Sequence, residues 1–105
     1  MVARLRYVLV PRTRTAIRNV LVTRDYVYVD VELPRPYLLT PKTLRRLEEK
    51  FYLYGAVIRH GNEVRSFRVA IPKQVLEAHR VDLDMAKYYA CKLVEEVLVE
   101  VISSE

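Results

Sequence analysis

Residues 26–33 (YVYVDVEL) alternate strictly between two kinds of side chain, and this alternation constrains the fold more than any other feature of the chain. Successive side chains of a β-strand point to opposite faces of a sheet. One face of this segment is aliphatic and consists of Val27, Val29, Val31 and Leu33. The other face carries Tyr26, Tyr28, Asp30 and Glu32. We therefore expect a sheet with one face buried against a core and the other face open.

The rest of the chain supplies further strands and helices. Runs of β-branched and aromatic residues predict strands at residues 4–10, 16–23, 26–33, 56–60 and 64–71. Pro34 and Pro36 are expected to end the third strand, and Gly61–Asn62 is expected to turn the last hairpin. Helices are predicted at residues 41–54, 72–79 and 83–102, although the β-branched end of the last segment leaves a strand over residues 97–102 open.

Capping residues support these helices and complete the expected fold. Thr40 and Pro41 are a typical helix start, Gly55 is a natural residue to follow that helix, and Asp82 is suited to cap the last one. The element order βββαββαα predicts an α+β fold. We expect a five-stranded antiparallel sheet with helices packed on one face and a long C-terminal helix, all within a single domain of residues 1–105.

Charge divides the chain into a basic body and an acidic, apolar tail. Residues 1–80 hold 16 Lys and Arg against 7 Asp and Glu, whereas residues 81–105 hold 2 against 6. Arginine outnumbers lysine 13 to 5, and guanidinium groups make planar, bidentate contacts with phosphate. A GC-rich genome would also favour arginine. A basic body of this kind is typical of proteins that bind polyanions.

Aromatic and basic residues form three candidate nucleic-acid-binding groups. Exposed tyrosines beside arginines would stack unpaired bases and neutralise phosphates, although a solvated sheet face can show the same pairing. The loop at residues 11–15 (PRTRT) and one face of the first helix add further cations, which a solvated loop and helix would also explain. The candidate residues are Arg4, Arg6, Arg12, Arg14, Arg18, Tyr26, Tyr28, Arg45 and Arg46.

The predicted last helix is apolar on more than one side, which indicates an oligomer interface. A single core-facing stripe cannot bury all of its apolar residues. Self-association through a heptad-like seam would bury the rest, whereas a helix wrapped by its own domain is the alternative. The residues assigned to the interface are Leu83, Ala86, Ala90, Leu93, Val94, Val97, Leu98 and Val101.

Several classes of function are not expected. Cys91, His60 and His79 are isolated from one another, so we predict no metal site and no disulfide. No glycine-rich phosphate loop is present, and we predict no cofactor and no enzymatic activity. The chain lacks an apolar run of membrane-spanning length, so a cytoplasmic location without membrane contact is expected. Scarce amides and abundant charge resemble a thermophile protein.

Residues 67–78 (FRVAIPKQVLEA) resemble the strand–Ile-Pro-Lys–helix segment of AbrB-type swapped-hairpin transcription factors. That resemblance implies DNA binding by a dimer through Arg65, Arg68 and Lys73. It covers about a dozen residues, and residues 79–82 with a helix-like run follow where the family has a glycine-containing turn and a strand. The departure is large enough that the family assignment is not adopted.

Together these features predict a non-enzymatic nucleic-acid-binding protein that acts as a homodimer or higher homo-oligomer. Single-stranded DNA or RNA is the favoured ligand, with low sequence specificity and strong salt dependence. One alternative is a structural subunit of a larger ribonucleoprotein or polymerase assembly. Another is a dimeric DNA-binding transcription regulator.

Overall fold

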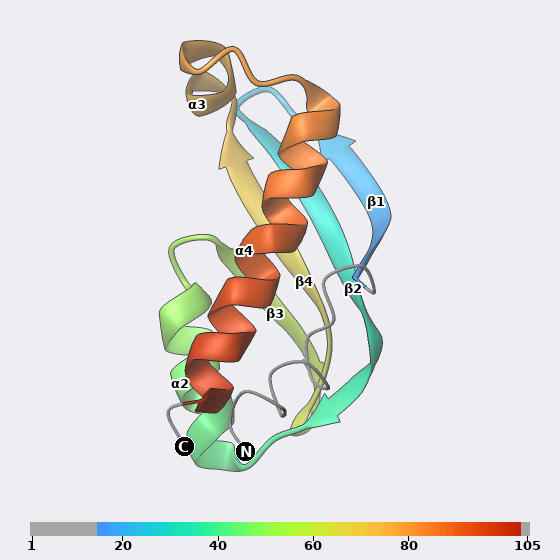
Figure 1. Cartoon of the computed structure of the whole chain (residues 1–105), viewed down its shortest axis with the longest axis vertical. Coiled ribbons are helices and arrows are strands. Elements are labelled where there is room, and N and C mark those ends of the chain that lie inside the picture. The colour runs from blue at the N-terminus through green and yellow to red at the C-terminus, as the bar shows by residue number, and fades with distance from the viewer. Residues whose placement is uncertain (1–14, 104–105) are drawn as a thin grey trace.

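The computed structural model describes residues 15–103, which form one antiparallel sheet with helices on one of its faces (Figure 1). The strands of this region are β1 (Ala16–Val22), β2 (Tyr26–Leu38), β3 (Gly55–His60) and β4 (Glu63–Pro72), in the spatial order β1-β2-β4-β3. The helices are α2 (Pro41–Phe51), α3 (Lys73–Ala78) and α4 (Leu83–Ser103). Helix α4 runs across the sheet, and α2 packs beside it and against β3.

The α+β class, the antiparallel sheet and the long C-terminal helix are confirmed. The sheet has four strands in residues 15–103 instead of the five expected, and the strand predicted at residues 4–10 lies outside the described residues. The last segment is helical to Ser103, so the strand alternative for residues 97–102 is wrong. Helical spacing there places Val97 and Val101 on the core.

Strand β2 does not end at Pro34 as predicted but continues to Leu38. Its pairing with β4 is interrupted between Glu32, opposite Ser66, and Tyr37, opposite Val64. Both prolines fall inside this irregular stretch and are exposed, so their missing N–H groups remove no bond from the ladder. The strand then resumes and buries Tyr37.

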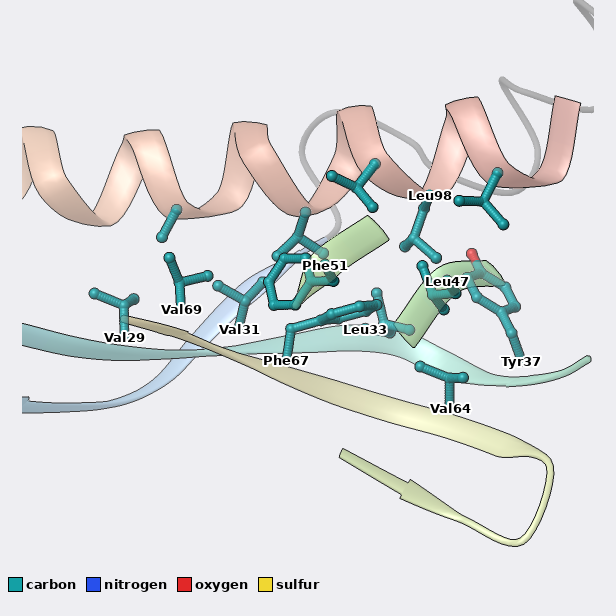
Figure 2. Packing of buried hydrophobic residues seen from close by; sticks show 14 of the residues in the cluster. Val29, Val31, Leu33, Tyr37, Leu47, Phe51, Val64, Phe67, Val69 and Leu98 are labelled. Atoms are coloured by element: carbon teal, nitrogen blue, oxygen red, sulfur yellow. The ribbon is translucent and has the colours of Figure 1, made fainter. Parts of the chain in front are cut away.

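The core lies between the sheet and the helix layer (Figure 2). The aliphatic face of β2 is buried as the alternation predicts, and the buried side chains of β4 lie beside it. Phe51 at the end of α2 meets Phe67 of β4 edge to face, with 4.9 Å between ring centroids. Leu47 and Leu98 extend this contact between the two helices (Figure 2).

Capping residues fix where the helices begin, but Gly55 does not end α2 in the way expected. The Thr43 N–H donates to Thr40 Oγ1 at 3.2 Å, and the Met85 N–H donates to Asp82 Oδ1 at 2.8 Å. Helix α2 ends at Phe51, and residues 52–54 form a turn. Gly55 instead opens β3 with a φ of +151°.

Candidate nucleic-acid interface

The face of the sheet opposite α2 and α4 carries the polar and aromatic side chains of β2 and their neighbours. The register between β2 and β4 places Tyr28 opposite Ala70 and Asp30 opposite Arg68. On the other side, Leu21 of β1 lies opposite Tyr28. We call Leu21, Tyr26, Tyr28 and Arg68 the stacking face.

Tyr26 and Tyr28 form the centre of the stacking face. Their rings stack on each other with centroids 5.8 Å apart and planes inclined by 25°. Tyr26 is 41% exposed and Leu21 is 46% exposed, so a flat apolar group has access to this surface. The alternation along β2 placed both tyrosines on this side, and the structure brings them into contact.

Arg68 is held beside the tyrosines by Asp30. Arg68 Nε donates to Asp30 Oδ1 at 2.7 Å, and Arg68 Nη2 donates to Asp30 Oδ2 at 3.0 Å. The guanidinium carbon also lies 5.8 Å from the centroid of the Tyr28 ring. The hydrogen bonds from Arg68 lower the pKa of Asp30 despite its partial burial, and they raise the pKa of Arg68.

Replacing Arg68 with methionine should raise the pKa of Asp30 and lower the free energy of unfolding at pH 7 by about 1 kcal/mol, since the guanidinium is partly exposed. A lowered carboxyl pKa stabilises the fold above the unfolded value near 3.9, and this contribution is lost as the pH falls through the folded pKa. The variant and the wild type should therefore converge in stability toward pH 2.

Urea denaturation at both pH values and an NMR titration of the Asp30 carboxyl carbon measure these effects. Arg65→Met is the matched control, because Arg65 approaches Glu63 only to 3.7 Å and both side chains are solvent-accessible. A pKa of Asp30 that stays lowered in Arg68→Met would contradict the assignment of the cause.

The other predicted nucleic-acid-binding residues are divided between two regions. Arg18 lies in β1 at the irregular step between Ile17 and Asn19, and its charge helps to lower the pKa of Asp30. Arg45 and Arg46 lie on α2, in the layer on the opposite face, so they do not share a surface with the tyrosines. The remaining candidates lie outside the described residues: Arg4, Arg6, Arg12 and Arg14.

Acidic partners offset much of the positive charge in the described part of the chain. Asp30 and Glu32 share the open face with Arg18 and Arg68. Elsewhere Arg59 pairs with Glu48 at 3.1 Å and Lys50 pairs with Glu100. The open face of residues 15–103 is therefore distinguished by its aromatic rings and not by an excess of cations.

The predicted oligomer seam lies mainly in the chain's own core. Leu83 is 42% exposed and Leu93 is partly buried, but the other six residues lie on the buried side of α4 and belong to the core. The six buried residues are Ala86, Ala90, Val94, Val97, Leu98 and Val101. The heptad-like spacing thus identified the core-facing stripe of the helix, because the sheet and α2 cover it.

Reactive groups are sparse in the region that the structure describes. Residues 15–103 contain no cluster of three or more His, Cys, Asp or Glu side chains arranged to hold a metal ion. Burial raises the pKa of the Cys91 thiol, and the nearby Glu95 acts in the same direction, whereas a hydrogen bond with Thr15 opposes them. None of the helices between residues 15 and 103 has the length and hydropathy to cross a membrane.

Comparisons of the chain with known protein families, curated proteins and solved structures found no match. The likeness to swapped-hairpin transcription factors ends after α3. The likeness covers residues 67–72 of β4 and the whole of α3, but helix α4 follows where those factors have a strand.

Proposed function

We propose that this protein is a non-enzymatic binder of single-stranded nucleic acid and that the stacking face is its binding surface. The observation that carries the proposal is the stacked pair of Tyr26 and Tyr28, with Arg68 fixed beside Tyr28 on the face opposite the helices. Aromatic rings on an open sheet face offer flat surfaces to unpaired bases, and every base has a face that can stack.

The charge of the stacking face favours single strands over duplex. A duplex hides its base faces and binds mainly through many phosphate contacts. The described part of the open face holds acids as well as arginines, so it offers little net charge to a duplex backbone. Stacking contributes about 1–3 kcal/mol per base and requires no excess of cations.

We expect the cations at the edges of this face to contact the phosphates. Arg18 lies close to Asp30, and Arg24 is exposed in the turn that leads into Tyr26. These two arginines border the strand that carries the tyrosines. The proposal also includes phosphate contacts by Arg4, Arg6, Arg12 and Arg14. These contacts would make part of the affinity depend on salt.

The combined substitution Tyr26→Ala and Tyr28→Ala should weaken binding of a labelled oligothymidylate at least tenfold, because two stacking surfaces are removed. Fluorescence anisotropy measures the dissociation constant, with an oligonucleotide so short that it binds only one copy of the protein. The matched control is Tyr26→Phe with Tyr28→Phe, which keeps both rings and should retain affinity within about threefold.

Circular dichroism and thermal unfolding establish that each variant is folded. Equal affinity of the alanine and phenylalanine variants would refute the role of the rings. A tenfold loss in the phenylalanine variant would show that the hydroxyl groups bind and that stacking does not.

A further inference from the structure

A second unpartnered surface lies on the helix side of the molecule. Within residues 15–103, eight of the thirteen exposed large hydrophobic side chains lie in the turn after α2, in helix α3 or in the first half of α4, and six of these eight line one groove. We call these eight residues the helix-side patch: Tyr52, Leu53, Tyr54, Val75, Leu83, Met85, Tyr88 and Tyr89.

The helix-side patch combines a recess with a projecting edge. A groove of about 720 Å³ lies between α3, α4 and residues 53–54, with side chains of β4 among those that line it. Val75, Met85 and Tyr89 line its walls. Leu53 borders the groove and is 83% exposed, so it projects from the turn into solvent.

The exposed area of the patch is of the size that one partner contributes to a stable dimer. Its four tyrosines alone expose roughly 450 Å², since a whole tyrosine offers about 200 Å². Leu53, Met85 and the two smaller aliphatic residues add to this area. Monomers rarely leave contiguous apolar patches of more than a few hundred Å², and a standard interface buries about 800 Å² per partner.

The charges around the groove permit two copies of this basic chain to approach each other. Lys92 and Glu96 both line the groove, one helical turn apart on α4. Lys87 Nζ lies 3.8 Å from Asp84 Oδ1 in the first two turns of the same helix. On this part of α4 two cations and two acids balance, whereas the whole chain carries a formal charge of +5. These charges on α4 therefore oppose the approach of a second copy only weakly.

We propose that the helix-side patch is the interface of a homodimer. In a two-fold contact the same patch meets itself, so a projection on one copy must find a recess in the same patch of the other. Here the edge formed by Leu53 would enter the groove of the second copy. This interface uses exposed residues of α4 and includes Leu83 from the set that the sequence assigned to an oligomer interface, whereas six other members of that set are buried.

The dimer would leave both stacking faces open, because α4, which carries four of the eight patch residues, covers the sheet face opposite to Tyr26 and Tyr28 (Figure 1). One assembly would then carry two binding surfaces for a long single strand. Dimerisation can be measured without nucleic acid. A failure of the dimer proposal can therefore be distinguished from a failure of the proposed function.

Sedimentation equilibrium of the full chain tests the proposal. The wild type should be a dimer at micromolar concentration, and Leu53→Asp or Tyr89→Asp should each raise the dimer dissociation constant at least tenfold. The matched control is Ile58→Asp, because Ile58 is 45% exposed, close to the 54% of Tyr89, but lies opposite Ser66 on the other face of the sheet. This variant should remain a dimer.

Two results would overturn the proposal. One is a wild type that stays monomeric at the highest soluble concentration, which would leave the patch to a different protein. The other is a dimer that survives both Leu53→Asp and Tyr89→Asp. Circular dichroism of the two variants verifies that a monomeric result does not come from unfolding.

Discussion

Replacing Phe51 with alanine should lower the free energy of unfolding by about 3–5 kcal/mol, one of the two largest effects we expect. Phe51, the last residue of α2, has no exposed surface and packs against Phe67 of β4. The substitution removes the ring from the junction of α2, α4 and the sheet and leaves a cavity. A loss of this size is a large share of the total stability of a domain, which is about 5–15 kcal/mol.

Urea denaturation at fixed protein concentration measures this loss for Phe51→Ala. The control is Leu38→Ala, because Leu38 is 80% exposed and its truncation removes little from the core. The control should change stability by less than about 0.5 kcal/mol. Similar losses in the two variants would mean that the ring of Phe51 is not at the centre of the core.

Replacing Gly55 with alanine should cost about 3 kcal/mol or more, although only a methyl group is added. A Cβ at this position would lie 1.8 Å from the carbonyl oxygen of Arg68, and the φ of +151° is one that L-residues rarely adopt. The neighbouring strand must move away to make room. That movement would disturb the hydrogen bond from Ala70 N–H to the Tyr54 carbonyl, which is 2.8 Å long.

Gly61→Ala is the matched control for this position. Gly61 also has a positive φ, of 61°, but a Cβ there would meet no atom within 4 Å. Only the backbone penalty applies, and we expect a loss of about 1 kcal/mol. Thermal unfolding of both variants measures the difference. If Gly55→Ala were no worse than Gly61→Ala, the close approach of Arg68 to Gly55 would be incorrect.

Local patterns in the sequence predicted most elements of the described fold. The alternation along residues 26–33 is a property of neighbouring side chains, so it identified the buried and open faces of β2. Thr40 and Asp82 act within one helical turn, and both caps were predicted correctly. The continuation of β2 past Pro34 was missed because it depends on an irregular pairing with a distant strand.

The candidate sites were less predictable because they depend on contacts between distant segments. Asp30 and Arg68 are 38 residues apart and meet only through the register of β2 and β4. The spacing along α4 indicated apolar stripes but not which one the chain's own sheet would cover. The helix-side patch likewise assembles from three segments, and no single sequence window contains it.

The central claim is that the open sheet face binds unpaired bases by stacking. The most direct test is a titration of the wild-type chain with labelled single-stranded and duplex oligonucleotides of equal length, at about 50 and 200 mM salt. We predict at least tenfold tighter binding of the single strand, with the preference kept at the higher salt because stacking is not screened. Equal or tighter binding of the duplex would contradict the claim.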